Sequence, residues 1–423
     1  MLKLLTNGTE TEAESVATTL DELAREGAQR MLETALQAEV ADYIERHCDK
    51  RDDKGRALVV RNGRAPERGL MCGAGTLAVK APRVNDTRVD EAGVRQKFTS
   101  KILPPYMRKS PKIAEVLPVL YLRGLSSGDF REALPVLVGE DATGLSPSVI
   151  TRMTAAWDQE YAAFQQRDLS AKDYVYVWAD GVHFNIRLEE DRLCTLVIIG
   201  VLPDGTKELV TVEDGYREST ESWLSVLRDL HDRGMRPPAL AVGDGALGFW
   251  AALRQVWPAT EEQRCWFHRL GNVLDKLPKR LQPKAKRMLS EIMNADTRAH
   301  AKADIAAFVA EFDDKYPKAV KSLRRDEDKL LTFFSFPAPH WRHLRTTNVI
   351  ESSFATVRLR QRVTKGAGKS ARGLMMAFKL LDMAQARWRK INGAAALPLV
   401  RTDAVFEDGI QINNDDHQRG IAA

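Results

Sequence analysis

The sequence predicts an α/β protein, because segments with the apolar pattern of buried strands alternate with segments of helical spacing between residues 174 and 267. At 423 residues the chain is too long for one ordinary hydrophobic core, which predicts two or three domains. A hydrophobic content of 44% with 29% charged residues is typical of globular rather than disordered chains.

Residues 1–110 form the first predicted region, which is helical and basic. Residues 10–47 show helical spacing. The apolar stripe predicted on this helix consists of Leu20, Ala24, Ala28, Met31, Ala35 and Ala38. Residues 49–66 are charged and contain glycine, which predicts a loop or flexible arm. Residues 69–84 predict a hairpin with Gly73 and Gly75 at its turn, surrounded by basic side chains.

Residues 111–158 have the pattern of a helix-turn-helix. The spacing predicts one helix over 113–122, a stop at Gly124 and a second helix over 130–138. Ser146-Pro147-Ser148 opens a third helix, which carries Arg152. Three short helices also occur in many α-rich domains, so taken alone the pattern leaves both a DNA-binding and a purely structural interpretation open.

The strands follow in a defined order. The sequence predicts strands at 174–188, 193–202, 208–212, 240–243 and 262–267, with helices at 219–233 and 247–256. Three antiparallel strands followed by alternating helix and strand is the order of a ribonuclease-H-like sheet. Residues 170–269 and 346–393 are assigned to this domain, the helical residues 270–345 to an insertion in it, and 394–423 to a tail without assigned function.

Three acidic residues stand out against this predicted sheet. Asp180 lies inside the first strand and Asp244 ends a buried strand, where open α/β sheets place their ligands. Glu351 begins a helix on which Arg358 and Lys365 follow at seven-residue intervals. Carboxylates suit hard divalent cations, so the set predicts a two-metal phosphoryl-transfer site that uses Mg²⁺ or Mn²⁺.

Each acid also has a structural explanation. Asp180-Gly181 and Asp244-Gly245 are typical turn sequences, and this chain uses Asp-Gly elsewhere. Asn348-x-x-Glu351 resembles a capping box, in which the glutamate satisfies backbone donors at a helix start. The combination favours the catalytic interpretation, because an acid inside an apolar strand is costly unless it is paired or bound to metal.

Two further positions stay ambiguous. Cys265 and His268, predicted at the end of the last strand, lack a second pair with zinc-site spacing, so a structural role and a role beside the carboxylates are both open. His183, near Asp180, has the same ambiguity. The four cysteines show no paired spacing, which argues against a disulfide framework and fits a reducing cytoplasm.

Charge and hydropathy restrict the environment and the partner. The longest apolar stretch, 193–202, is about half the length that a membrane helix needs, and residues 1–26 are acidic rather than typical of a signal peptide. Residues 340–392 carry twelve Lys or Arg against two acids, a second basic cluster lies at 276–287, and such stripes suit phosphate backbones. A solvated helix face explains either stripe alone equally well.

The chain resembles the mutator-type DDE transposases of bacterial insertion sequences, over about residues 30–390. The motifs that carry the resemblance, in chain order, are Arg61-Asn62-Gly63, Leu122-Arg123-Gly124-Leu125-Ser126, Ser146-Pro147-Ser148-Val149-Ile150-Thr151-Arg152, Asp180-Gly181-Val182-His183, Asp244-Gly245, Cys265-x-x-His268 and Thr346-Thr347-Asn348-Val349-Ile350-Glu351. Several ordered motifs at family spacing are far more specific than any single Asp-Gly.

The resemblance implies that Asp180, Asp244 and Glu351 are the metal-binding catalytic triad, supported by Cys265 and His268. It also implies that Arg358 and Lys365 contact DNA phosphates, and we assign Arg152 to DNA binding as well. The expected activity is binding of terminal inverted repeats, metal-dependent DNA cleavage and strand transfer, by a homodimer that acts with the nucleoid in the cytoplasm. A non-catalytic DNA-binding regulator and a nuclease without strand transfer remain the alternatives.

Overall fold

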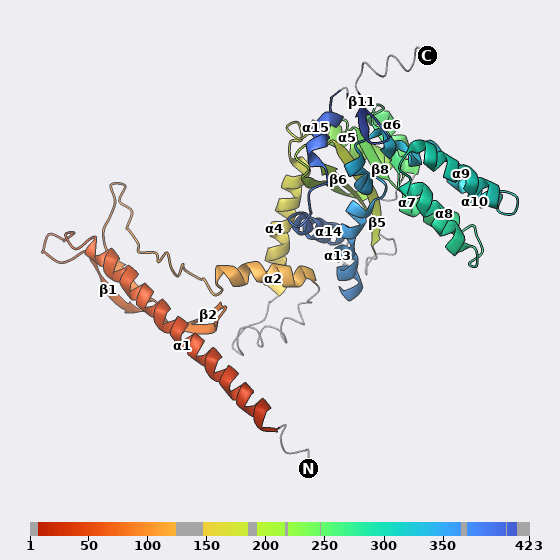
Figure 1. Ribbon diagram of the computed structural model, residues 1–423. Coiled ribbons are helices and arrows are strands. Elements are labelled where there is room, and N and C mark those ends of the chain that lie inside the picture. The colour runs from red at the N-terminus through yellow and green to blue at the C-terminus, as the bar shows by residue number, and fades with distance from the viewer. Residues whose placement is uncertain are drawn as a thin grey trace. The chain divides into compact units, whose positions relative to one another are not determined.

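The computed structural model describes residues 7–123, 147–184, 193–215, 219–245, 247–364, 370–402 and 404–412. The chain divides into two compact units, Met1–Met153 and Thr154–Ala423. The first unit contains one long helix with short strands, and the second is built on a sheet with helices around it (Figure 1). In the ranges described, no helix is long and apolar enough to cross a membrane.

Helix α1 (Asn7–Glu45) confirms the predicted N-terminal helix and packs through its C-terminal half. Leu36 and Val40, four positions apart on one face, are buried. The predicted apolar stripe was wrong in part, because Leu20 is 65% and Met31 75% exposed. In an alanine-rich helix the same spacing fits several faces, and the face with Leu36 and Val40 is the one that meets the strands.

The short strands of the first unit form two antiparallel pairs. β2 (Arg68–Cys72) and β3 (Gly75–Val79) make a hairpin with Cys72 opposite Gly75, as the sequence predicts. β1 (Val59–Arg64) pairs with β4 (Pro82–Asp86). The predicted loop over 49–66 was therefore wrong at β1, because this strand buries only Val59 and so lacks the alternation that reveals a strand.

A buried carboxylate ties α1 to β4 in the first unit. Asp86 is 4% exposed and accepts hydrogen bonds from Arg88 Nη2 and from the Tyr43 hydroxyl, each over 2.7 Å. The hydrogen bond from Arg88 lowers the pKa of Asp86 to about 2, although burial alone would raise it. The carboxylate is therefore charged, and stabilises the fold, throughout the neutral range.

We expect the first unit to lose this stabilisation in acid. Because the folded pKa lies below the ordinary value of 3.8, the contribution of about 2 kcal/mol is complete above about pH 5 and is lost as the pH falls towards 2. Asp86→Asn should lower the stability at pH 7 and remove this pH dependence. Pulsed hydrogen exchange of the β4 amides, after equilibration at each pH, measures both effects. If the variant lost as much stability on acidification as the wild type, both expectations would be contradicted.

Helices α2 (Pro111–Arg123) and α4 (Pro147–Gln166) correspond to the first and third helices of the predicted helix-turn-helix. The second predicted helix, over 130–138, lies outside the described residues. The helix-turn-helix itself therefore stays a prediction.

The second unit contains a five-stranded sheet with the order β7-β6-β5-β8-β9 (Figure 1). The strands are β5 (Tyr176–Phe184), β6 (Leu193–Val201), β7 (Lys207–Gly215), β8 (Leu240–Gly243) and β9 (Glu261–Arg264). β5, β6 and β7 are antiparallel, whereas β8 and β9 run parallel to β5. This mixed α/β sheet confirms the predicted order of three antiparallel strands followed by alternating helix and strand.

Helices α5 (Thr220–Asp232) and α6 (Leu247–Val256) pack on one face of the sheet. Val177 and Ala179 of β5 point into a fully apolar core on this side, where Trp223 of α5 is 1% exposed. Burial of large aromatic side chains contributes strongly to stability, so this core fixes the position of β5 against both helices.

The alternate residues of β5 point to the opposite face. The Tyr176 hydroxyl lies 2.9 Å from His340 Nδ1, and Trp178 Nε1 donates to the His343 carbonyl over 2.9 Å. Helix α13 (Asn348–Thr364) follows His340 and His343 in the chain and also contacts β5. The residues before and within α13 are thus anchored on the face of the sheet to which Asp180 points.

The segment between β9 and α13 contains only helices among its regular elements, and its role as an insertion in the sheet domain stays a prediction. Its elements are α7 (Trp266–Leu274), α8 (Gln282–Asn294), α9 (Arg298–Phe312), α10 (Pro317–Arg324), α11 (Glu327–Leu330), η1 (Thr332–Ser335), η2 (Ala338–His340) and α12 (Trp341–Leu344). The later part of the segment, at α11 and η1, is tied to β9. The buried Gln263 donates to the Leu330 carbonyl over 3.1 Å and accepts from the Phe333 N–H over 2.8 Å.

The C-terminal residues pack on the second unit. After α14 (Ser370–Gln385), which contacts β7, they form η3 (Ala394–Ala396), α15 (Leu397–Val400), β10 (Val405–Glu407) and β11 (Ile410–Ile412). Gly409 at the β10–β11 turn donates to the Phe334 carbonyl and accepts from the Ala338 N–H, each over 3.1 Å. A Cβ at position 409 would lie 2.5 Å from that of Ala338 and φ is +79°, so the contact requires glycine. The tail is thereby fastened to the helical segment.

Candidate metal and nucleic-acid site

Three neighbouring parallel strands bring Asp180, Asp244 and Cys265 to one edge of the sheet, namely the edge at which β8 and β9 reach their carboxyl ends. Ala179 pairs with Gly243, and Gly243 pairs with Arg264. Each of the three residues directly follows one of these paired positions, and neighbouring strands are about 4.8 Å apart. The structure therefore places Asp180, inside β5, next to Asp244, which directly follows β8, and both side chains are half-buried.

Glu351 reaches this edge from the first turn of α13, with 20% of its side chain exposed. Its Oε1 accepts a hydrogen bond from the Thr347 hydroxyl over 2.6 Å. The backbone N–H of Thr347, just before the helix, is directed at Cys265 Sγ over 3.4 Å. The capping-box alternative is therefore wrong, because the carboxylate accepts from a hydroxyl rather than from the backbone donor at the helix start.

Cys265 and His268 lie on a helix rather than at the end of a strand, which corrects the prediction. β9 ends at Arg264, Cys265 is the N-cap residue of α7 and His268 is in its first turn. The apolar run of Trp266 and Phe267 suggested a longer strand, but Trp266 is buried among helices whereas Phe267 is 59% exposed. Sequence alternation alone does not separate these two environments over four residues.

His268 lies beside Glu351 and within the electrostatic influence of Asp244. Its Nδ1 is buried without a hydrogen-bond partner among the described residues and is 3.9 Å from Glu351 Oε1. The Cys265 side chain raises the pKa of His268 to about 9, helped by the charges of Asp244 and Glu351 and opposed by burial. One donor atom from each of Cys265, His268 and Glu351 lies within 4.8 Å of the others, so this edge can hold a proton or a cation.

A second layer of charged residues fixes the backbone at Asp244. The Asp244 carbonyl accepts from Arg264 Nη1 over 2.5 Å and from Trp250 Nε1 over 2.9 Å. Arg264 also lies 3.1 Å from Asp326 Oδ2, and Arg269 bonds to the same oxygen. The side chains of Arg264 and Arg269 are 5% and 3% exposed, so Asp326 compensates two buried guanidinium groups.

Sequence reasoning missed Thr347, Arg264 and Asp326. One signal was available for Arg264, since a charged residue in a strand that is otherwise buried usually has a specific partner. Thr347 stands in the motif that ends at Glu351, but the sequence assigns it no contact, and nothing in the sequence signals Asp326. Thr347 meets Cys265 across 82 positions and Asp326 meets Arg269 across 57.

The predicted basic and supporting residues are only partly brought together. Arg358 is exposed on α13, with its guanidinium carbon 5.9 Å from the centre of the Phe354 ring. Lys365 and the side chain of Arg152 lie outside the described residues. His183 is exposed, and its odd spacing from Asp180 along β5 directs it to the opposite face of the sheet.

Comparisons with known proteins find similar chains over most of this sequence. The family described as "Transposase, Mutator family" matches residues 2–376. A transposase for insertion sequence element IS6120 of Mycolicibacterium smegmatis is 57% identical over 70% of this chain and 92% of its own length. A transposase for element IST2 of Acidithiobacillus ferrooxidans is 47% identical over 67% of this chain and 96% of its own length.

Two of the solved structures that match this chain show only weak similarity. The HTLV-2 integrase catalytic core domain in complex with magnesium is 15% identical over 30% of this chain and 88% of its own, with a TM-score of 0.17. The Drosophila P element transposase strand transfer complex is 10% identical over 73% of this chain and 92% of its own, with a TM-score of 0.24. TM-scores this low do not establish a shared fold.

Proposed function

The chain belongs to the mutator family of transposases, and from this premise we propose that it is a DDE enzyme that cleaves and joins DNA with Asp180, Asp244 and Glu351. One observation carries the proposal. Asp244, just after β8, and Glu351, at the start of α13, both lie close enough to His268 to raise its pKa, and Asp180 of β5 lies beside Asp244. If these acids served only local turns and a helix cap, their side chains would not be expected to lie together.

The donor set fits a hard divalent cation. The three carboxylates are half-buried, so they reach solvent while sitting on rigid elements, and the unpartnered Nδ1 of His268 marks a polar position beside Glu351. Asp180, Asp244 and Glu351 would hold Mg²⁺ or Mn²⁺. When bound, these ions stabilise charge on the attacking and leaving oxygens of an in-line phosphoryl displacement.

The other residues of the site would position these ligands. Thr347 holds the Glu351 carboxylate by its hydroxyl, and Arg264 holds the backbone of Asp244. Cys265 and His268 would support the site electrostatically rather than bind zinc. Arg358, Lys365 and Arg152 would contact backbone phosphates, which cationic side chains recognise without regard to sequence.

We assign different functions to the different regions of the chain, which divides into two compact units. We assign recognition of the terminal inverted repeats to residues 111–158 and the basic part of residues 1–110. Residues 170–269 and 346–393 would form a ribonuclease-H-like catalytic domain, with 270–345 as its helical insertion and 394–423 as a tail. A homodimer would hold the two ends of the element together.

A cleavage and strand-transfer assay tests this function. Labelled duplex that carries the inverted repeats flanking the coding sequence is incubated with the protein and Mg²⁺ or Mn²⁺, with a chelator as control. Nicking at the repeat end and a joined product are expected. Binding without cleavage would instead indicate a DNA-binding regulator, and cleavage without joining from a supplied 3′-hydroxyl end would indicate a nuclease.

We expect Thr347→Val to slow cleavage about 10- to 100-fold without weakening DNA binding, because loss of an outer hydrogen bond disorients a metal ligand. The Mg²⁺ concentration that gives half the maximal rate should rise as well. Thr347→Ser keeps the hydroxyl and should restore both values. A rate loss in the serine variant as large as in the valine variant would show that the methyl packing of Thr347, rather than its hydrogen bond, matters.

A further inference from the structure

A cationic pocket lies in the helical segment of the second unit, between α7 and α10. Its volume is about 400 Å³. The residues that line it are Asn272, Asp275, Lys276, Lys318, Lys321, Ser322 and Arg325. Four of the seven are cations and one is an acid, so the pocket carries an excess of three positive charges.

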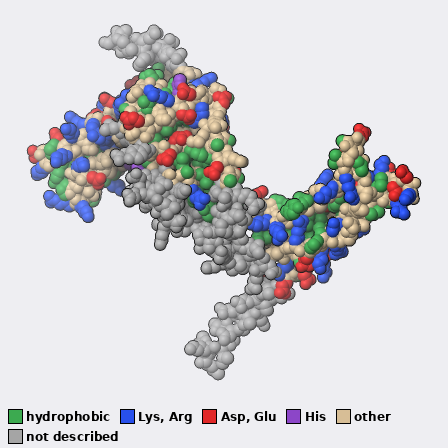
Figure 2. All heavy atoms as spheres, turned by 180° about the vertical axis from the view of Figure 1, so that it is seen from behind, with side chains coloured by type: hydrophobic (Ala, Val, Ile, Leu, Met, Phe, Trp, Pro, Cys, Tyr) green, Lys and Arg blue, Asp and Glu red, His purple; other side chains and the backbone are tan. Residues whose placement is uncertain are grey.

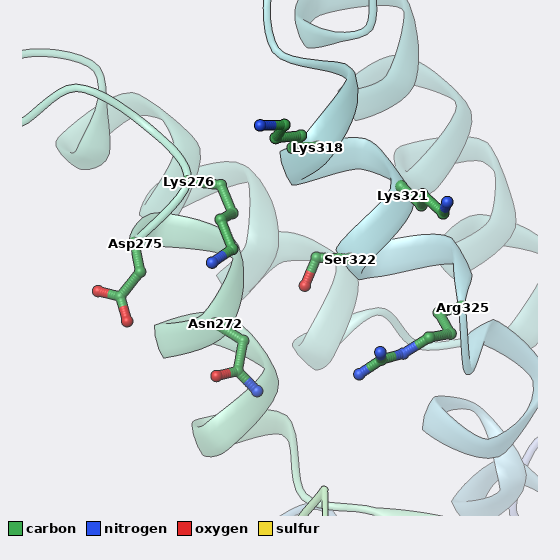
Figure 3. A pocket seen from close by; sticks show the side chains of 7 residues that line it. All are labelled: Asn272, Asp275, Lys276, Lys318, Lys321, Ser322 and Arg325. Atoms are coloured by element: carbon green, nitrogen blue, oxygen red, sulfur yellow. The ribbon is translucent and has the colours of Figure 1, made fainter.

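The side chains of this pocket converge from two facing helices. Figure 3 shows the Arg325 guanidinium directed into the space between α7 and α10, with the Ser322 hydroxyl on the α10 side and Asn272 and Lys276 on the α7 side. The Asp275 carboxylate points away from this space. Two cations, a hydroxyl and an amide are the side-chain types that most often contact nucleic-acid phosphates.

The positive charge of the pocket is not neutralised within the described ranges. Lys276, Lys318 and Lys321 make no ion pair with any residue that the structure describes. Arg325 lies 3.9 Å from Asp326, but Arg264 and Arg269 already share the same carboxylate oxygen. Like charges held together without a counter-charge repel one another, so the arrangement favours an anion between them.

The surroundings of the pocket favour an extended anion over a small one. Four further cations follow on the chain after α7 and on α8, exposed and without an ion pair in the part that the structure describes: Lys279, Arg280, Lys286 and Arg287. Figure 2 shows Lys and Arg side chains gathered over this helical end of the second unit. A strip of cations longer than one anion suits the repeating phosphates of a nucleic acid.

A chain of contacts joins the pocket to the carboxylate edge. The Ser322 carbonyl accepts a hydrogen bond from the Arg269 guanidinium, Arg269 and Arg264 share Asp326, and Arg264 donates to the Asp244 carbonyl. Both guanidinium groups are buried, so these contacts lie inside the packed unit. A phosphate held at Lys276 and Arg325 would therefore be fixed relative to the proposed metal site.

We infer that this pocket is a second DNA contact, which binds a backbone phosphodiester away from the bond that reacts. The inference rests on the proposed function, which supplies DNA as the substrate. It assigns the helical segment the role of holding DNA flanking the cleavage point. Because the contact is to the backbone, it adds affinity equally for all sequences.

The test measures DNA binding of the full-length chain over a series of salt concentrations, on a duplex with the terminal repeat and on an unrelated duplex. Lys276→Gln combined with Arg325→Gln should weaken binding to both about 10-fold and lower the slope of log affinity against log salt by about two, since each phosphate contact contributes about 0.9. Lys276→Arg with Arg325→Lys keeps the charges and should bind as the wild type.

Lys302→Gln is the matched control, because Lys302 is exposed on α9, outside the pocket. Slopes that are equal in this control and in the double variant would overturn the proposal. Equilibrium dialysis with inorganic phosphate separates the two anion sources. Saturable phosphate binding that is lost in the double variant, with an unchanged DNA slope, would assign the pocket to a free anion and reject the DNA contact.

Two measurements keep the result interpretable. Tryptophan fluorescence melting shows whether the double variant is folded. If the double variant does not fold, Lys318→Gln at the pocket edge replaces it and should lower the salt slope by about one. An unchanged slope in Lys318→Gln would equally reject the contact. Cleavage by the wild type at saturating protein tests the proposed function separately. Wild-type cleavage with unaltered slopes in the variants would therefore overturn the pocket alone.

Discussion

Asp244→Asn is expected to lower DNA cleavage by about 10³-fold or more while leaving DNA binding within about twofold of the wild type. The amide keeps the shape of the side chain but lacks the negative charge that a divalent cation requires. Loss of a cation that stabilises transition-state charge removes several kcal/mol, and each 1.36 kcal/mol is tenfold in rate. Asp180→Asn and Glu351→Gln should have effects of the same size.

The control for this series is Asp232→Asn, which makes the same chemical change at an exposed end of α5, 79% exposed and away from the sheet edge. It should cleave as the wild type does. Labelled terminal-repeat duplex reports cleavage and a mobility-shift titration reports binding. Cleavage retained in any one of the three site variants would exclude that residue as an essential ligand, and retention in all three would reject the DDE assignment.

Asp326→Asn should destabilise the second unit by about 3–5 kcal/mol, the range observed when one partner of a buried ion pair is removed. The change leaves Arg264 and Arg269 buried without a counter-charge. All eight tryptophans lie between residues 157 and 388, so tryptophan fluorescence during urea unfolding reports the second unit alone. Asp313→Asn, at an exposed position after α9, should leave the unfolding midpoint unchanged.

The Asp326 effect should also depend on pH. Burial raises the pKa of Asp326, but the charges of Arg264 and Arg269 outweigh burial and hold the pKa below its ordinary value. Burial lowers the pKa of Arg269 as well, yet an arginine begins so high that the ion pair persists at neutral pH. The stabilisation is therefore present above about pH 4 and is lost below it. A constant difference between wild type and variant down to pH 2 would contradict this assignment.

Local chemistry made much of the second unit predictable from sequence. The structure keeps the predicted bounds of β8 and α6, and α5 begins after Ser219, whose hydroxyl accepts from the Ser222 N–H over 3.1 Å. Such capping depends on a few adjacent residues, which a single sequence displays directly. The two aspartates were identifiable for the same reason, because an acid that ends or interrupts an apolar strand is visible locally.

Contacts between distant segments were not predictable in this way. The sequence did not show that Cys265 starts a helix, because Trp266 and Phe267 fit a strand equally well until the packing of α7 is known. Thr347 and Asp326 depend on partners many positions away. The buried face of α1 was misassigned because its alanines fit several faces and only the strands select one.

The position of Glu351 along the chain also determines when the site can exist. Asp180, Asp244 and Cys265 lie on the sheet strands and at the start of α7, whereas the third carboxylate follows only after the whole helical segment from α7 to α12. The 107 residues that separate Asp244 from Glu351 take roughly 5–20 s to synthesise at 5–20 residues per second. A growing chain thus passes through a period in which residues 1–158, the region proposed to bind the terminal repeats, are already synthesised and the third proposed metal ligand is not. A chain that stopped within that period would keep the proposed repeat-binding region and lack Glu351.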